Sequence, residues 1–261
     1  MNQKQGILVV SFGTSYREAF EKNIVSVERE IQNAYPSACV RRAFTSRMII
    51  KKLAARDQFH VDTVSEALEG FLNDGCTELL VQPTHIINGN ENDSMLETLC
   101  AYRSRFTNIR VGAPLLSGKE DCQQVIDALT GHYAGLASQN ALVFMGHGTA
   151  HHADFAYPAL DYMCKASGHA NIHIATVEGY PTLEEVKASL RIQKPKQVIL
   201  APLMLVAGDH AANDMAGDND DSWKSQLEHE GFSVSCRLEG LGEYPEIRAL
   251  FLEHLKNAKT L

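Results

Sequence analysis

Short apolar runs alternate with amphipathic helical windows along nearly the whole of this chain. The run at Leu142–Met145 is typical of a buried parallel strand, and Ile7–Ser11 and Glu78–Gln82 have the same character. Between such runs lie windows with apolar residues at three- and four-residue spacing, for example Thr63–Asp74. Strands that alternate with helices in this way predict an α/β protein built on parallel sheets.

The order of motifs starts again near Ala141, which indicates an internal repeat. The corresponding segments are LVVSFGTS (8–15) with LVFMGHGT (142–149), RRAFTS (41–46) with IATVEG (174–179), LLVQPTHIINGNE (79–91) with ILAPLMLVAGDH (199–210), and PLLSG (114–118) with EGLGE (239–243). We therefore expect two similar lobes, 1–135 and 136–261, each a parallel sheet flanked by helices, facing each other across a cleft. The alternative is a single doubly wound sheet with the usual strand–turn–helix rhythm.

Composition excludes several classes of function. The formal charge of −8 argues against a nucleic-acid partner, because binding phosphate groups needs a basic face. No segment approaches eighteen consecutive apolar residues, so we expect no membrane span. The six cysteines occur singly, and the first apolar run is too short for a signal peptide. These features predict a cytoplasmic protein with reduced thiols.

The segment Gly146-His147-Gly148 follows the predicted strand at Leu142–Met145. Glycine on each side allows a sharp turn and leaves the imidazole uncrowded at the carboxyl end of the strand. Ligands bind at that end of open parallel sheets, and a neutral imidazole there can ligate a metal or accept a proton. The alternative is a turn histidine with a satisfied hydrogen bond.

Superposing the repeats places His147, Glu178 and His210 at three strand ends of the second lobe. Two imidazoles and one carboxylate suit a divalent first-row metal and leave a coordination position open for a substrate. On its own, Glu178 also fits a helix cap or a surface carboxylate. The matching positions of the first lobe include Phe12 and Glu91.

An apolar segment, Leu203–Ala207, separates the third strand of the second lobe from His210. Such a segment at a strand end predicts a flat apolar ligand lying on it. Asp209 and Asp214 are available to orient His210 through hydrogen bonds. The alternative is a buried connection in which Asp214 caps the following helix.

Further polar groups lie near the predicted strand ends of the first lobe. His85 fits a substrate contact, a second and weaker metal site, or a structural role. Arg47 belongs to the densest basic stretch, which suits substrate carboxylates but also a solvated helix face. His151 and His152 are adjacent, and adjacent residues rarely point at one ion, so we expect loop positions. No phosphate-binding loop, dinucleotide fingerprint or hydrolase elbow is present, so we expect no ATP and no nucleotide.

Several longer motifs resemble those of one family, the anaerobic sirohydrochlorin cobaltochelatases of cobalamin biosynthesis. They are LVVSFGTS, AFTSRMIIKKL, HIINGNE, VFMGHGTAHH, PLMLVAGDHAANDM and GLGEYPEIRALF, and they follow one another over essentially the whole chain. The resemblance implies a ferrochelatase-like fold with the tetrapyrrole between two lobes, and insertion of Co²⁺ into sirohydrochlorin without ATP. It also implies that His147 and His210 act as metal ligands and proton acceptors, and that Glu178 is a metal ligand.

The substrate contacts that we expect are Phe12, Thr14, Arg47, His85, Glu91, Leu203 and Met204. Fe²⁺ or Ni²⁺ is the alternative metal, because a site of two histidines and one glutamate selects weakly between neighbouring ions. A tetrapyrrole- or metal-binding carrier without turnover is the alternative of another class, and a metal-dependent hydrolase is a weaker third. The sequence leaves open whether the chain forms a homo-oligomer.

Overall fold

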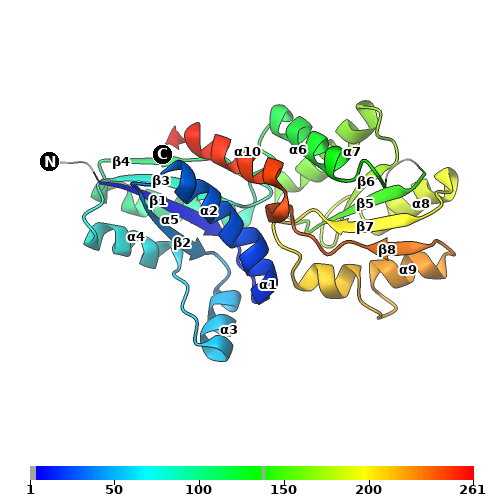
Figure 1. The fold of residues 1–261 in the computed structure, drawn as a ribbon, viewed down its shortest axis with the longest axis horizontal. Coiled ribbons are helices and arrows are strands. Elements are labelled where there is room, and N and C mark those ends of the chain that lie inside the picture. The colour runs from blue at the N-terminus through cyan, green and yellow to red at the C-terminus, as the bar shows by residue number, and fades with distance from the viewer. Residues whose placement is uncertain (1–3, 137–138) are drawn as a thin grey trace. The chain divides into compact units, whose positions relative to one another are not determined.

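The computed structural model describes residues 4–136 and 139–261 (Figure 1). The chain divides into two compact units: unit 1 is Met1–Ser117 together with Pro245–Leu261, and unit 2 is Gly118–Tyr244. The strands of the described residues form one sheet in each unit. A single doubly wound sheet is therefore wrong. The α/β class, with parallel sheets flanked by helices, is confirmed.

The sheet of unit 1 has the order β2-β1-β3-β4-β9. Its strands are β1 (Gln5–Ser11), β2 (Cys39–Phe44), β3 (Glu78–Pro83), β4 (Asn108–Val111) and β9 (Lys259–Thr260). The first four run parallel, while β9 pairs antiparallel with β4. In this register Val10 lies beside Ala43 and Pro83, so β1, β2 and β3 end at the same edge of the sheet.

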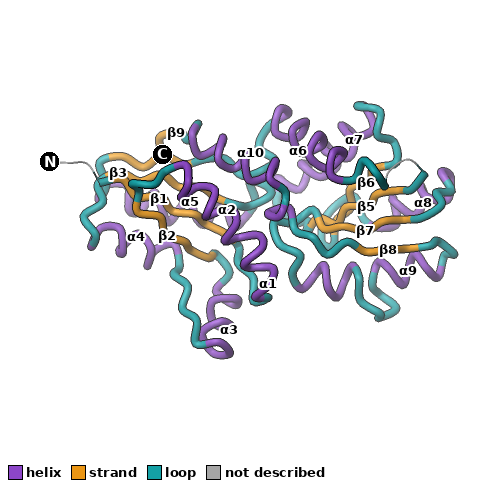
Figure 2. The backbone as a smooth tube through the Cα atoms, in the orientation of Figure 1, coloured by secondary structure: helices purple, strands orange, loops and turns teal. Residues whose placement is uncertain are grey.

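Helices pack around the strands of unit 1 (Figure 2). They are α1 (Arg17–Ala19), the π-helix η1 (Phe20–Ile24), α2 (Val25–Ala34), α3 (Arg47–Asp57), α4 (Val64–Asn73), α5 (Asn90–Tyr102), η2 (Arg103–Arg105) and α10 (Pro245–Lys256). Leu8 and Val10 of β1 belong to one core cluster with residues of α4 and α5. On α4, Thr63 caps the first turn through a reciprocal capping box with Glu66.

The sheet of unit 2 has the order β6-β5-β7-β8, and all its strands are parallel. They are β5 (Ala141–Gly146), β6 (Ile172–Thr176), β7 (Val198–Pro202) and β8 (Val234–Cys236). The residues of β5, β6 and β7 are all buried, which explains the continuous apolar sequences of β5 and β7; β6 also buries His173 and Thr176. The order matches the first four strands of unit 1, as the internal repeat predicts.

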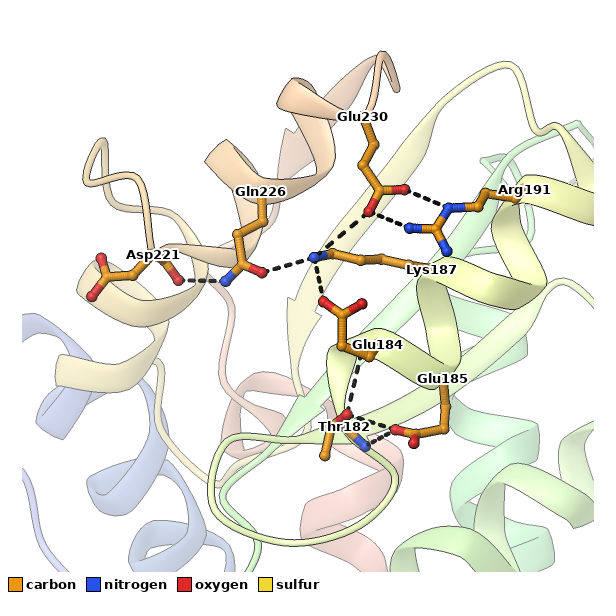
Figure 3. A network of polar contacts seen from close by, with 8 residues as sticks. All are labelled: Thr182, Glu184, Glu185, Lys187, Arg191, Asp221, Gln226 and Glu230. Carbon is orange, nitrogen blue, oxygen red and sulfur yellow. Dashed lines mark hydrogen bonds and ion pairs between the residues drawn. The ribbon is translucent and has the colours of Figure 1, made fainter.

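The helices of unit 2 pack on its sheet. They are α6 (Lys119–His132), η3 (His152–Phe155), α7 (Ala156–Ala166), α8 (Leu183–Gln193), the π-helix η4 (Ala211–Met215), α9 (Trp223–His229) and η5 (Leu241–Glu243). A polar network joins α8 to α9 (Figure 3). In it the buried ammonium group of Lys187 contacts Glu184 at 2.6 Å and Gln226 at 2.8 Å, and Arg191 pairs with Glu230.

The division between the units differs from the expected lobes 1–135 and 136–261. Helix α6 belongs to unit 2, because Tyr133 at its end packs against Phe144 and its hydroxyl lies 3.0 Å from that of Tyr244. The C-terminal segment belongs to unit 1, where α10 packs on α2 and β9 pairs with β4. Each unit is therefore completed by a helix from the other half of the sequence. The pattern of sequence motifs does not predict this exchange of helices.

Two further findings concern membrane-spanning helices and the cysteines. In the part of the chain that the structure describes, no helix combines the length and apolar character needed to cross a bilayer. The six cysteines all lie in that part and are free thiols.

Candidate metal centre

His147 lies immediately after β5, where glycines determine the path of the chain. Gly148 has φ +80°, and a Cβ atom there would collide with the backbone nitrogen of Gly179. A Cβ atom on Gly146 would collide with the buried ring of Tyr157. The turn therefore requires these glycines, and it leaves the His147 side chain 44% exposed.

Glu178 lies in the loop after β6, directly beside this turn. Its backbone N–H donates to the carbonyl of His147 at 2.9 Å, and its Oε2 lies 3.9 Å from Nδ1 of His147. Helix α8 is capped by Thr182 together with Glu185, so the reading of Glu178 as the helix cap is wrong. Its carboxylate is 60% exposed and belongs to the edge of the sheet that carries His147.

His210 completes the group from the segment after β7. Its ring meets that of His147 edge to face, with centroids 4.6 Å apart and planes at 90°. Its Nδ1 lies 2.5 Å from Oδ2 of Asp214, within the π-helix η4. Asp214 does not cap α9, because Ser222 has that role. The structure thus brings together the three residues that the sequence analysis placed at strand ends.

Hydrogen bonds determine which ring nitrogen each histidine leaves available. Nδ1 of His147 lies 2.9 Å from the carbonyl oxygen of Gly148, which can only accept, so this nitrogen carries the proton. Nδ1 of His210 likewise donates to the Asp214 carboxylate. In the neutral form of each ring the lone pair is therefore on Nε2, which can ligate a cation or accept a proton.

The three side chains are neighbours without forming a closed ligand set. Within residues 4–136 and 139–261, the one trio of such groups whose ligand atoms all lie within 4.8 Å of one another is His60, Asp62 and Glu66. Glu66 of that trio is engaged in the capping box of α4, and His60 is exposed. At the centre in unit 2, the Glu178 carboxylate and the His147 ring are 60% and 44% exposed and the His210 ring is 34% exposed, so all three are accessible to an incoming ion.

The apolar segment after β7 is mostly internal. Leu203 is fully buried, and its backbone N–H donates to the carbonyl of Met145 at 2.7 Å. Its side chain lies in the core, which contradicts the expected substrate contact. Met204 is partly exposed while it packs against the core of unit 2, so it remains accessible to a ligand.

Other predicted substrate residues lie at the strand ends of unit 1. Phe12, directly after β1, is 45% exposed, and Arg47 is exposed at the first position of α3. Glu91 lies half-buried in the first turn of α5. Thr14 is buried, and its hydroxyl accepts the N–H of Tyr16, so it shapes the turn after β1.

His85 lies just after β3 and is buried, with 8% of its surface exposed. Within the described residues, neither of its ring nitrogens has a partner with hydrogen-bond geometry. Burial lowers the pKa of His85 to about 4, and the nearby Asn92 side chain offsets only part of that effect. The ring is therefore neutral at physiological pH.

Two weaker predictions have structural explanations. Arg41 and Arg42 of the basic stretch form ion pairs with Asp74 and Glu28 of unit 1. Their charges are therefore neutralised within that unit rather than directed at a ligand. Nδ1 of His151 accepts the N–H of Ala153 and caps η3. Its place in a loop agrees with the sequence analysis. Asp154 was not among the residues expected from the sequence, yet its carboxylate contacts the loops of both His147 and Glu178.

Comparison with known proteins identifies the family. The sequence profile described as "Cobalt chelatase (CbiK)" matches residues 5–260. The chain belongs to this cobalt chelatase family. The chelatase is 44% identical over 258 residues to the sirohydrochlorin cobaltochelatase of Salmonella typhimurium, covering 99% of this chain and 97% of that one. It is 37% identical to the sirohydrochlorin cobaltochelatase CbiKC of Nitratidesulfovibrio vulgaris, covering 98% and 90%. The resemblance read from the motifs is confirmed.

Solved structures agree with the fold of the chelatase. SirB from Bacillus subtilis with Fe³⁺ matches at a TM-score of 0.66 and 16% identity, covering 98% of this chain and 95% of that one. A second structure of SirB, in complex with cobalt, matches equally well at 15% identity with the same coverage. At such low identity these two structures show a shared fold and nothing about the residues of the site.

Proposed function

We propose that this chelatase inserts Co²⁺ into sirohydrochlorin, and that His147, Glu178 and His210 hold the incoming ion. The curated relatives are named for that reaction. The observation that carries the proposal is the meeting of two imidazoles and one carboxylate at the ends of parallel strands in unit 2. Cytoplasmic location and independence of ATP stay predictions from the sequence.

The chemistry of insertion matches these groups. The macrocycle must lose two pyrrole N–H protons, and the ion must lose water from its coordination shell. The Nε2 lone pairs of His147 and His210 suit both tasks, since imidazole accepts protons near neutral pH and binds first-row divalent ions. Glu178 adds a negative oxygen ligand that offsets the charge of the ion while it is partly dehydrated.

The choice of metal is a separate part of the assignment. Donors of two histidines and one glutamate discriminate weakly between Co²⁺, Fe²⁺ and Ni²⁺. A competition assay that offers all three ions to the purified protein with sirohydrochlorin measures the preference directly. We expect a cobalt product in excess of the uncatalysed control.

The test of the site uses variants of each proposed ligand. Replacing His147 or His210 with Ala should lower the rate of insertion, followed by absorbance, by on the order of 100-fold or more. Glu178→Gln should weaken Co²⁺ binding while the fold persists. His152→Ala is the matched control, because that histidine is exposed in the adjacent η3. Undiminished insertion by a folded His147 or His210 variant would exclude that residue, and product equal to the uncatalysed control would indicate a carrier.

We also propose that Phe12, Arg47, Glu91 and Met204 contact the macrocycle, because each of these side chains is at least partly exposed, whereas His85 is buried. Arg47 is exposed and suits a substrate carboxylate. Arg47→Ala should raise the KM for sirohydrochlorin and leave the KM for Co²⁺ unchanged. Equal KM values for the variant and the parent protein would remove Arg47 from this role.

A further inference from the structure

One carboxylate joins the two loops that carry His147 and Glu178. Asp154 lies in η3, just before α7. Its Oδ1 accepts the N–H of Thr149 at 2.9 Å, and its Oδ2 accepts the N–H of Tyr180 at 2.8 Å. Thr149 lies two residues after His147, and Tyr180 lies two residues after Glu178. Each carboxylate oxygen of Asp154 therefore accepts a hydrogen bond from the residue that follows a proposed ligand by two positions, one in each loop.

The loops have little free space at this junction. A Cβ atom on Gly148 would collide with the backbone of Gly179, and a Cβ atom on Gly179 would collide with the Asp154 carboxylate. On the near side, the N–H of Glu178 donates to the carbonyl of His147. Backbone hydrogen bonds therefore join the loops where they leave the sheet, and Asp154 joins them beyond the two ligand residues.

We propose that Asp154 is a positioning residue whose carboxylate sets the separation of His147 and Glu178 for the incoming cation. The inference rests on the proposed function, because it assigns no ligand of its own. Asp154 uses both oxygens on backbone N–H groups, so it acts on the ion through the two loops. Only a carboxylate presents two acceptors on one planar group, and an Asn side chain at this position would turn its NH₂ group toward an N–H donor.

The chelatase offers a matched control on the same helical segment. Asp161 of α7 also accepts a backbone N–H with its carboxylate, that of Ile174 in β6, at 2.9 Å. Asp161 thus fastens this helical region to strand β6, whereas Asp154 fastens it to the two loops that carry the proposed ligands. Asp161 also pairs with Lys165, so substituting it weakens a backbone hydrogen bond and an ion pair of the same helical region while the loops of His147 and Glu178 keep their contacts.

The experiment compares Asp154→Asn with Asp161→Asn in the metal-free, full-length protein. Co²⁺ binding is followed by the visible d–d absorption of the ion, and KM is measured separately for Co²⁺ and for sirohydrochlorin. We expect Asp154→Asn to weaken Co²⁺ binding by roughly 10- to 100-fold, to alter the d–d band and to raise only the KM for Co²⁺. Asp161→Asn should lower thermal stability and leave Co²⁺ affinity and the band unchanged.

Several outcomes separate the two proposals. Parental affinity and an unchanged band in Asp154→Asn, or equal losses of affinity in both variants, would overturn the role of Asp154. His147→Ala is measured in parallel: if it too binds Co²⁺ as the parent does, the proposed ligand set has failed. If Asp154→Asn does not fold, Asp154→Glu takes its place, since it keeps both acceptors and misplaces them. Parental Co²⁺ affinity in that variant would equally exclude the inference.

Discussion

Nδ1 of His210, the residue just before the π-helix η4, donates to Oδ2 of Asp214 within that helix at 2.5 Å. A carboxylate in this place fixes the tautomer of the ring and makes Nε2 the nitrogen that meets a cation. The pair is the local counterpart of the hydrogen bond from His147 to the carbonyl of Gly148. Both histidines are thus held by Nδ1.

The first prediction concerns Asp214→Asn. The variant should lower Co²⁺ affinity and the rate of insertion by roughly 10- to 100-fold, because His210 loses a charged partner that orients its ring. Asp218→Asn is the control, since Asp218 lies in the same acidic segment but pairs with Lys224 on the surface. Titration with Co²⁺ followed by absorption measures both. Equal affinity in the two variants would contradict the role of Asp214.

The second prediction compares two glycines that both have a positive φ angle. Gly148 (φ +80°) and Gly168 (φ +89°) both lie in the left-handed region, so alanine at either should cost about 1 kcal/mol of stability. Only at Gly148 does the added Cβ also meet the backbone of Gly179, whereas Gly168 has open space. Gly148→Ala should therefore abolish most insertion activity and Gly168→Ala should preserve it. Thermal melts first check that both variants are folded, and insertion assays then compare their activities. Equal activities would contradict the prediction.

A third prediction follows from the buried ring of His85. Its pKa is lowered from 6.5 to about 4 by burial, so between these pH values the unfolded chain binds a proton that the folded chain excludes. Stability should therefore fall as pH falls through that window, by on the order of 3 kcal/mol in all. An NMR titration of the His85 ring tests the cause, and the urea midpoints of the parent and His85→Gln at pH 7 and pH 5 test the effect. A ring that titrates near 6.5 would contradict it.

The fourth prediction concerns Lys187, whose side chain is 8% exposed within the network between α8 and α9 (Figure 3). Lys187→Ala should lower the free energy of unfolding by roughly 2 kcal/mol, because Gln226 and Glu230 lose a buried cationic partner. Lys224→Ala removes an exposed ion pair and should leave the free energy of unfolding almost unchanged. Urea unfolding measures both changes. Equal losses would show that the network contributes no more than a surface pair.

Much of the fold was predictable because its signals are local. Continuous apolar runs mark β5 and β7, since strands buried on both faces have no polar side to alternate with. The repeated order of motifs predicted one strand order for both sheets. Strand ends also placed His147, Glu178 and His210 near one another, because the carboxyl ends of neighbouring parallel strands share one edge.

The sequence by itself therefore determined the α/β class, the repeat, the family and the set of proposed ligands. Tertiary structure alone decided where the units divide, because α6 and α10 exchange between halves through contacts distant in sequence, such as that of Tyr133 with Tyr244. It also decided that Leu203 faces the core and that Asp154 joins two loops. Whether two backbone N–H groups donate hydrogen bonds to one carboxylate depends on the path of the folded chain, and no residue pattern records that path.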